Sequence, residues 1–362
     1  MNDKLKNVVV TIAFVFIIVI FFIANIIKTD DTISIAERRK LEQFPQISAK
    51  TVFNGTFFNK FNKYTTDQFV QREEFRKLKI NAEFNLLRKS DYNNLYQYGD
   101  YIISQTYPLN EKSVLNISKK INQIYEQYLT DQNNVYFTIV PDKNYFINDE
   151  NLKLDYNKLE NLLNRNLSFA KYIRIFDMLE LEDYYKTDTH WKQERLLKVA
   201  KTIAESMNVN LENEYKEKTI CDFQGTYSGQ LPISTAKDKI KILTNSEIEK
   251  SKVYNYETKK ENKVYNMEKI NSLDKYDIYL SGATPVLKIE NPENKTGNEL
   301  IIFRDSYASS LVPLFIPKYS KITLIDTRYI SPKLLPNYVE FNNQDILFMY
   351  STLVINNSYS LK

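Results

Sequence analysis

The sequence predicts a three-layer α/β fold, in which a mostly parallel sheet is flanked by helices after one N-terminal transmembrane helix. Two observations support the sheet. Short apolar runs such as 135–140, 299–303 and 345–350 are typical of strands that are buried on both faces. Segments with helical spacing separate these runs, and strands that alternate with helices indicate βαβ units.

The composition excludes several classes of function. The 362 residues include one His and one Cys, so an internal disulfide and a Cys/His zinc site are both excluded. The six glycines form neither GxGxxG nor GxxxxGK, and the common nucleotide-binding loops are therefore absent. The net charge is +4, without a long basic run, so we expect no nucleic-acid partner. We expect neither a metal nor a resident cofactor.

The N-terminus carries a hydrophobic segment. Residues 8–27 are apolar except for Thr11 and Asn25, and a helix of this length spans about 30 Å, the thickness of the hydrocarbon core. A cleavable signal peptide has a shorter apolar stretch that ends in small residues, whereas this one continues into Lys28. We therefore expect an uncleaved single-pass anchor, and cleavage is the alternative.

The charges on either side of this segment predict its orientation. Lys4 and Lys6 precede it, whereas two aspartates follow it, and the positive flank of a membrane helix stays in the cytoplasm. The sequence thus predicts an anchor over residues 1–30 and an extracytoplasmic domain over residues 31–362, held at the cell membrane.

The spacing of apolar residues predicts the elements that follow the anchor. After a polar connector we expect one or two amphipathic helices within 54–89, a hairpin at 96–104, a helix over 113–130, a strand at 135–140, a helix over about 156–170, a strand at 172–179 and a helix over about 192–207.

The middle of the chain, about 211–295, is polar and rich in Lys and Glu, which predicts a β-rich insertion or lid. Its short alternating runs are 239–243, 276–280 and 285–289. The elements expected after it are a strand at 299–303, a helix over about 307–316, and strands at 321–327 and 345–350.

One loop with a candidate nucleophile follows the strand at 299–303. Ligands of such sheets bind at the carboxyl ends of the strands, and this strand leads through Arg304 and Asp305 to Ser306, just before a helix. The N–H groups at a helix start can stabilise a developing oxyanion. The alternative is that Ser306 or Asp305 is an N-cap, a common role of both residue types.

A second loop, 183–194, carries the only His and the only Trp of the chain, His190 and Trp191. Asp188 precedes the histidine by two residues. A serine nucleophile needs a base, and that base needs a carboxylate to hold its tautomer. Residues i and i+2 of an extended backbone point the same way, so Asp188 can lie beside His190. The alternative is helix capping by Asp188 or a neighbouring threonine, with His190 and Trp191 packed in the core.

These residues resemble a known group of proteins. Asp-Thr-His-Trp at 188–191, followed by Ser306 in RDSYASSLVP, is similar to the SGNH-hydrolase-like proteins of exopolysaccharide modification, which include the alginate O-acetylation proteins and the DHHW family. Pro-Asp-Lys at 141–143 and IDTRY at 325–329 agree with this resemblance, which spans about 35–355.

The resemblance implies an SGNH-like sheet and a Ser-His-Asp mechanism. In it, Ser306 is the nucleophile that carries the acyl group, His190 the general base and Asp188 its orienting carboxylate. The implied activity is extracytoplasmic O-acetylation of polysaccharide hydroxyls, with the acetyl group supplied by an acyl donor or a membrane-bound O-acyltransferase partner. The alternatives are a carbohydrate esterase of the same fold and a noncatalytic glycan-binding or scaffold module.

The sequence also departs from the pattern of this group. Arg304 stands where Gly usually precedes Asp-Ser, and a GxND block is not evident, which leaves the second oxyanion donor unassigned. For each candidate a structural hydrogen bond is the more common role. The candidates for oxyanion or substrate contacts are Lys143, an N–H within Gly225–Gly229 (Gly229 foremost), Tyr307 and Arg328, with Trp191 as a sugar contact.

Overall fold

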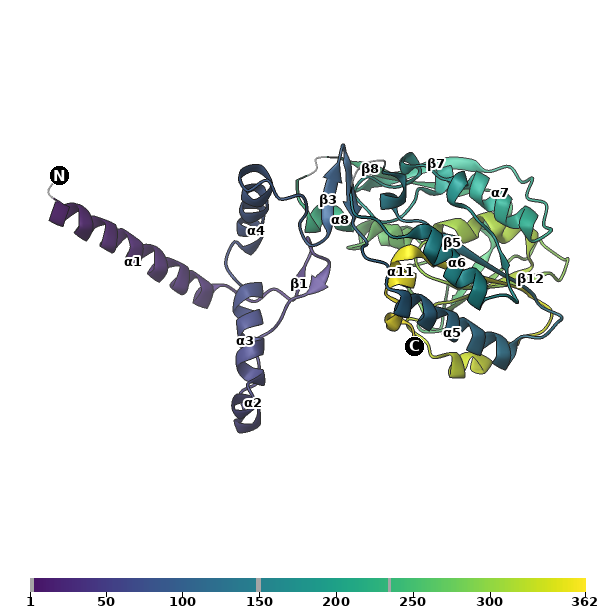
Figure 1. Ribbon diagram of the computed structural model, residues 1–362, viewed down its shortest axis with the longest axis horizontal. Helices are drawn as coiled ribbons and strands as arrows, with labels where there is room; N and C mark the ends of the chain where they lie inside the picture. Colours follow the sequence, from purple (N-terminus) through teal and green to yellow (C-terminus); the bar gives the residue numbers. More distant parts are fainter. Residues whose placement is uncertain (1–2, 148–150, 234–235) are drawn as a thin grey trace. The chain divides into compact units, whose positions relative to one another are not determined.

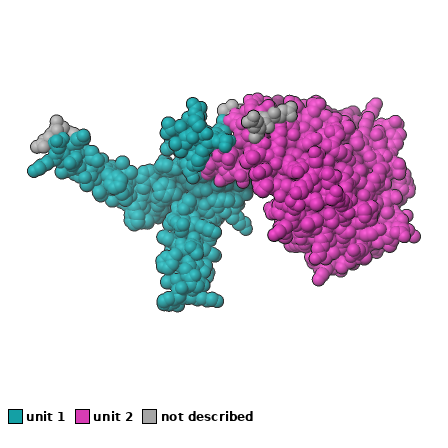
Figure 2. Space-filling model, viewed as in Figure 1, with its two compact units in different colours: residues 1–90, 229–233 teal, residues 91–228, 234–362 magenta. Residues whose placement is uncertain are grey.

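A computed structural model describes residues 3–147, 151–233 and 236–362 of the chain. The chain forms two compact units (Figure 2). The first unit contains residues 1–90 and 229–233, and the second contains residues 91–228 and 234–362.

The first unit contains the N-terminal helix α1 (Asp3–Ile27). In the described part of the chain it is the one helix that is long and apolar enough to cross a membrane, as an anchor or a signal sequence would be. Two amphipathic helices are confirmed within 54–89, α3 (Thr56–Asp67) and α4 (Arg72–Asn81). The unit also contains β1 (Ile33–Ser34), β2 (Arg39–Lys40), α2 (Ala49–Phe53) and a π-helical turn (Ala82–Leu86).

The second unit is built on an eight-stranded sheet (Figure 1). In spatial order its strands are β10 (Lys260–Asn262), β9 (Lys252–Asn255), β11 (Val286–Glu290), β13 (Lys321–Ile325), β12 (Glu299–Arg304), β14 (Asp345–Ser351), β5 (Asn134–Val140) and β6 (Lys171–Tyr172). The five strands from β13 to β6 are parallel, whereas β11, β9 and β10 pair antiparallel at one edge. The sheet is therefore mixed, with the predicted parallel part at its centre.

The antiparallel edge comes from the segment that was expected to be an insertion. Strand β11 joins the sheet because its buried residues Val286, Leu287 and Ile289 continue the core beside β13. The hairpin of β7 (Lys216–Phe223) and β8 (Asp238–Thr244) forms a separate two-stranded sheet. The predicted β-rich character is thus confirmed, but part of this segment belongs to the main sheet.

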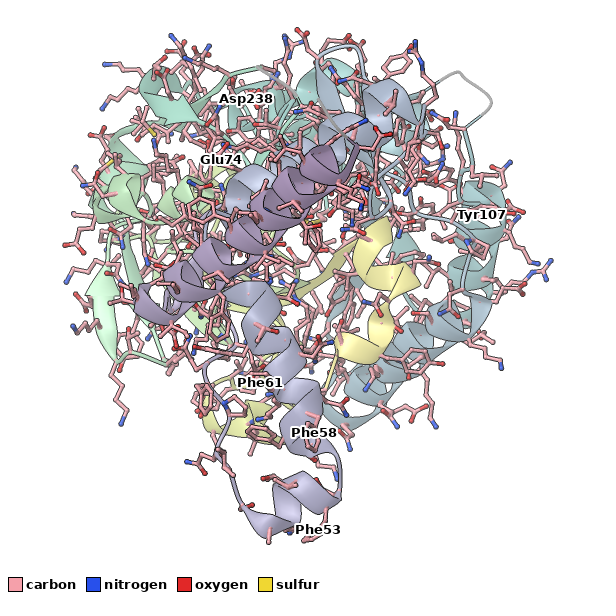
Figure 3. All side chains as sticks on the ribbon, turned by 90° about the vertical axis from the view of Figure 1, so that its left-hand side faces the viewer. Phe53, Phe58, Phe61, Glu74, Tyr107 and Asp238 are labelled. Carbon is pink, nitrogen blue, oxygen red and sulfur yellow. The ribbon has the colours of Figure 1, made fainter. Side chains whose placement is uncertain are left out.

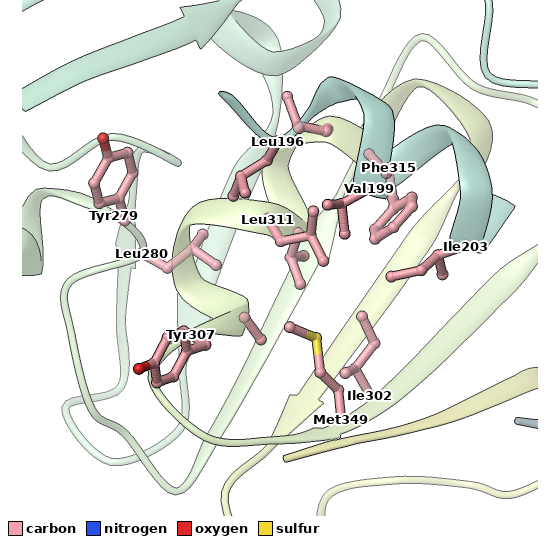
Figure 4. Close-up of a cluster of buried hydrophobic side chains, with 14 of the residues drawn as sticks. Leu196, Val199, Ile203, Tyr279, Leu280, Ile302, Tyr307, Leu311, Phe315 and Met349 are labelled. Atoms are coloured by element: carbon pink, nitrogen blue, oxygen red, sulfur yellow. The ribbon is translucent and has the colours of Figure 1, made fainter. Parts of the chain in front are cut away.

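Helices cover both faces of the sheet, as the three-layer prediction requires. Successive strand residues point to opposite faces of the sheet. Ile302 and Met349 pack in the cluster on one face (Figure 4), whereas Phe303 and Phe348 pack in the cluster on the other face. One face carries α7 (Leu197–Ser206), α10 (Ala308–Leu311) and the 3₁₀-helix Val312–Lys318; the other carries α5 (Glu111–Tyr128), α6 (Tyr156–Asn166) and α11 (Thr352–Asn356).

Several expected elements are shorter than predicted. The strand expected at 172–179 ends at Tyr172 and is followed by a 3₁₀-helix, Phe176–Met178. Most of the run at 276–280 lies in another 3₁₀-helix, Lys275–Ile278. The helix expected over 307–316 becomes 3₁₀ after Leu311, because Pro313 lacks the N–H that an α-helix needs. The hairpin at 96–104 is confirmed as β3 (Leu95–Tyr98) and β4 (Tyr101–Ser104).

Candidate active site

Ser306 lies at the carboxyl end of the central strand β12, between β13 and β14. The neighbouring Asp305 is buried and accepts hydrogen bonds from the N–H of Tyr307 (3.0 Å) and of Ser351 (2.7 Å). Asp305 is therefore the residue that caps this turn, and it ties the turn to β14. The side chain of Ser306 is left partly exposed at the edge of the sheet.

The side chains of Ser306, His190 and Asp188 form one chain of hydrogen bonds. His190 Nε2 lies 2.8 Å from Ser306 Oγ, and His190 Nδ1 lies 2.6 Å from Asp188 Oδ1. The backbone N–H of His190 also donates to Asp188 Oδ1, at 3.1 Å. A carboxylate at Nδ1 fixes the proton on that nitrogen, so Nε2 is free to accept the serine proton.

The carboxylate of Asp188 is held in its charged form although it is buried. Its second oxygen accepts the N–H of Thr226 at 2.8 Å. Burial on its own raises the pKa of this carboxyl, but the charge of His190 and the hydrogen bonds from His190 and Thr226 together hold the pKa well below its usual range. Asp188 is therefore ionised at neutral pH.

A second buried carboxylate, Asp238, holds the loop that carries Asp188. Its oxygens accept the N–H of Lys186 (3.0 Å), the N–H of Thr187 (3.0 Å) and the hydroxyl of Thr187 (2.7 Å). The Thr187 hydroxyl in turn accepts the N–H of Gly225 at 2.9 Å. Asp238 lies at the start of β8, far from either motif in sequence, and no pattern in the chain pointed to it.

Gly225 packs directly against the same loop. A Cβ atom built at Gly225 would lie 2.2 Å from Asp188 Cβ and 2.5 Å from the carbonyl oxygen of Thr187. Real Cβ atoms do not approach other atoms so closely, so this position requires glycine. The close approach also brings the N–H of Thr226 to the carboxylate of Asp188.

The ring of His190 is supported by Tyr276. The two rings stack with their centroids 3.8 Å apart and their planes 9° apart. The Tyr276 hydroxyl is in turn fixed by Ser310 Oγ at 2.8 Å. Sequence reasoning placed Tyr276 on a strand of the insertion and therefore missed this contact.

Solved structures of other proteins share this architecture. A DHHW family protein from Eubacterium siraeum matches with a TM-score of 0.60 and 21% identity, over 75% of this chain and 94% of its own. The SGNH-hydrolase-like fold is therefore shown. PatB1 from Bacillus cereus matches with a TM-score of 0.57 and 15% identity, over 72% of this chain and 96% of its own, and a second PatB1 structure contains a sulfonyl adduct. No family model and no curated protein sequence matches the chain.

Two predicted site residues have packing roles in this SGNH-hydrolase-like fold. Trp191 is fully buried, and its Nε1 donates to the carbonyl oxygen of Tyr307 at 3.0 Å. This burial leaves no surface for a sugar ring, so the expected sugar contact is corrected to a core contact. Tyr307 is also buried; its N–H is taken by Asp305, and its hydroxyl donates to the carbonyl of Thr189 at 2.8 Å. Neither group of Tyr307 is free to bind an oxyanion.

Arg328 and Lys143 are likewise engaged with protein groups. Arg328 forms a two-point ion pair with Asp326, through Nε to Oδ1 (2.9 Å) and Nη2 to Oδ2 (2.6 Å). Lys143 is buried and donates to the carbonyl oxygens of Ile102 and Tyr185, the latter at 3.0 Å. Lys143 therefore ties the strand β4 to the loop before Asp188 and is not presented to a substrate.

Gly229 belongs to the other compact unit, where its carbonyl accepts a hydrogen bond from Arg76 Nη2 at 3.3 Å. Within its GTYSG segment, the N–H groups of Gly225 and Thr226 are both engaged with the Asp188 loop. The structure thus gives this segment a positioning role in place of the oxyanion role that was considered for it.

Arg304, which departs from the usual Gly, lies beneath the site. It is fully buried and donates to Ser309 Oγ (2.9 Å) and to the carbonyl of Gly282 (3.2 Å), while burial lowers the pKa of its guanidinium. Its Nε has no hydrogen-bond partner among the described residues. The side chain thus packs under the turn and leaves the contact of Ser306 with His190 intact.

Proposed function

We propose that this protein is an extracytoplasmic O-acetyltransferase, which moves acetyl groups onto hydroxyls of a cell-surface or extracellular polysaccharide. The observation that supports the proposal most strongly is the hydrogen-bonded chain from Asp188 through His190 to Ser306. Such a chain activates a serine hydroxyl for acyl transfer. Its position at the carboxyl end of a central parallel strand agrees with where ligands of such sheets bind.

In the first step, Ser306 Oγ attacks the carbonyl carbon of an acetyl ester. His190 Nε2 takes the hydroxyl proton and delivers it to the oxygen of the leaving alcohol. The ester bond of the donor breaks and an acetyl-Ser306 ester forms. Asp188 stays ionised and stabilises the imidazolium that exists between the two proton transfers.

In the second step, a sugar hydroxyl attacks the acetyl-Ser306 ester. His190 takes the proton of that hydroxyl and returns it to Ser306 Oγ, so the enzyme is regenerated and the acetylated sugar leaves. If water attacks instead, the same steps make the protein an esterase. Ser306, His190 and Asp188 do the same chemistry in both cases, and the two activities differ only in whether a sugar hydroxyl or water accepts the acetyl group.

A donor for the oxyanion of both steps is the backbone N–H of Ser306. Within the described residues, this N–H has no hydrogen bond to another protein group. It lies at the turn into α10, where backbone dipoles favour negative charge. One such donor in a hydrolase is worth about 2.7–4 kcal/mol.

The location and partners are part of the same proposal. With α1 as an anchor, Lys4 and Lys6 in its first turns favour a cytoplasmic N-terminus, and the proposal therefore has residues 31–362 outside the membrane. The acceptor is then a polysaccharide of the envelope, and the donor is an acetyl ester or the acetyl group held by a membrane-bound O-acyltransferase.

The test incubates the full-length protein with p-nitrophenyl acetate, with and without hydroxyl-bearing oligosaccharides, and measures the masses of the glycan and of the peptide that contains Ser306. We expect acetyl on Ser306 and, with a suitable oligosaccharide, on the glycan. Ser306→Ala should lose both products, whereas Ser360→Ala, at an exposed serine, should keep them. Release of acetate without glycan acetylation identifies an esterase. A wild-type protein that binds glycan without acetylating Ser306 identifies a noncatalytic module.

A further inference from the structure

The first unit exposes large aromatic side chains on its short helices. Phe53 of α2 is 90% exposed, and Phe58 and Phe61 of α3 are 59% and 38% exposed (Figure 3). Exposed phenylalanines that follow one another along a surface are unusual in a soluble protein and mark an interaction site.

These side chains extend an apolar stripe along one side of α3. Phe57, Phe61 and Tyr64 recur at intervals of four and three residues, which places them on one helical face. Phe44 packs edge-on against all three rings, at centroid distances of 5.3–6.5 Å. The aromatic face, defined as Phe44, Phe57, Phe58, Phe61 and Tyr64, is thus a preformed surface.

The turn after α3 and the following helix α4 contact α1 within its apolar span. Phe21 of α1 packs against the rings of Phe69 and Phe75, each at 5.7 Å, and the N–H of Val70 donates to Asn25 Oδ1 at 2.9 Å. A largely apolar pocket of about 670 Å³ lies at this junction, lined by residues of α1, α3 and α4 and the turn between them.

These contacts set the depth of the helices if α1 crosses a membrane. Phe21 precedes the end of α1 at Ile27 by six residues, or about 9 Å along the helix. Any side chain that touches Phe21 then lies inside the outer leaflet. Helices that lie in a membrane interface bury their apolar face about 5–10 Å into the boundary of headgroups and acyl chains. Phe69 and Phe75 are therefore at the depth expected of such a helix.

The charges on α3 fit the same environment. Lys63 is exposed and lies off the aromatic face, whereas Lys60 is exposed at the margin of that face, three residues after Phe57 and four before Tyr64. Interfacial helices combine phenylalanine on one face with lysine on the other, because the lysines reach the lipid phosphates. A surface that binds another protein would not require lysines beside its phenylalanines, so this combination favours lipid as the partner of the aromatic face.

We propose that residues 44–81 form a second membrane-binding element, which lies in the outer interface of the bilayer with its aromatic face in lipid. The proposal rests on α1 as a membrane anchor and is independent of the acetyl-transfer activity. It gives the protein a second attachment to the membrane, in the segment that follows the anchor.

The test measures the depth of single spin labels on the full-length protein in vesicles of phosphatidylcholine and phosphatidylglycerol. The native thiol is removed by Cys221→Ser, and labels are attached after Phe58→Cys, Phe61→Cys or Asn59→Cys. Asn59 is the matched control, because it is exposed on the opposite side of the same helix. Each label is tested for collision with oxygen, which enters lipid, and with a nickel chelate, which stays in water.

We expect the ratio of oxygen to nickel collisions to be severalfold higher at positions 58 and 61 than at position 59. Equal ratios at the three positions would overturn the proposal. So would labels at 58 and 61 that neither reagent reaches, because a second protein copy would then cover the face. A separate measurement tests the anchor: release of the protein from the vesicles by alkaline carbonate would show that α1 does not span the membrane. This outcome is independent of the collision ratios at the labelled positions. Phe53→Cys, at the most exposed ring, repeats the test where the side chain contributes least to packing.

Discussion

His190 Nε2 lies 2.8 Å from Ser306 Oγ, although 116 positions separate the two residues in the chain. The contact exists because Ser306 ends the central strand β12 and the loop before α7 reaches the same edge of the sheet. The third member, Asp188, reaches His190 from within the same loop. Each residue of this hydrogen-bonded site, and each residue that holds it in place, leads to a separate prediction.

Asp188→Asn should slow the labelling of Ser306 by a sulfonyl fluoride by up to about 10⁴-fold, because an amide no longer selects the tautomer that leaves Nε2 unprotonated. The size of the side chain is kept, but an amide nitrogen would face an N–H donor of His190 or Thr226, so a loss of about 1–3 kcal/mol in the free energy of unfolding should accompany the slower labelling. The rate is measured by intact mass against time. A rate equal to that of the wild type would show that Asp188 does not orient His190.

Gly225→Ala should disturb the Asp188 loop, since the new Cβ would lie 2.2 Å from Asp188 Cβ. Overpacking of this kind costs about 1–3 kcal/mol, and the displaced carboxylate should slow labelling of Ser306 about tenfold or more. The control is Gly99→Ala, at a hairpin turn with a φ of 54° and no atom within 4 Å of the new Cβ. It should lower stability without changing the labelling rate. Equal labelling rates in both variants would refute the close packing at Gly225.

Asp238→Asn should loosen the loop that carries Asp188, because the carboxylate of Asp238 accepts three hydrogen bonds from Lys186 and Thr187 in that loop. An amide nitrogen would face these donors, at a cost of about 1–3 kcal/mol in the free energy of unfolding. Thermal unfolding gives the loss of stability, and probe labelling gives the loss of loop order. Asp222→Asn, at an exposed position of the same hairpin, should leave both unchanged. A stable, fully reactive Asp238 variant would contradict the role assigned to this residue.

The buried ammonium of Lys143 should make the free energy of unfolding depend on pH. Burial lowers the pKa of its ammonium to about 7, and the charges of Asp188 and Asp238 offset this only in part. The unfolded lysine has a pKa of about 10.4, so between these values the unfolded state holds a proton that the native state has lost. The free energy of unfolding then rises with pH, by up to about 1.4 kcal/mol per pH unit for one proton.

Lys143→Met removes this titration. The stability of the wild type relative to the variant should therefore increase as the pH is raised from 7 to about 9. Denaturant midpoints at several pH values measure the difference. A difference that stays constant or shrinks over this range would mean that Lys143 keeps its proton in the native state.

The parts of the site that could be predicted are those with local signals. Asp188 and His190 share one loop, and Ser306 follows an apolar strand, so a motif and a strand pattern were sufficient to name them. Whether they touch depends on topology, which the alternation of strands and helices indicated. In contrast, Asp238 and Tyr276 act through contacts between distant segments, and neither has a sequence environment that differs from an ordinary surface residue.

The fold shows the same division between local and distant signals. The buried strands β5, β12 and β14 were predicted because they are continuous apolar runs. Strand β11 looked like part of an insertion, since its pairing with β13 depends on residues far from it in sequence. Trp191 was misjudged because a tryptophan beside a candidate base looks the same in sequence whether it faces a sugar or the core.

The most direct test of the account is the time course of sulfonyl fluoride labelling of the full-length protein, followed by peptide mass analysis. The account predicts one adduct, on Ser306, in the wild type, its loss in Ser306→Ala and a large drop in rate in His190→Gln. With one histidine in the chain, no other imidazole can take over as the base. Labelling of Ser306 at the wild-type rate in His190→Gln, or an unmodified Ser306 in the wild type, would contradict it.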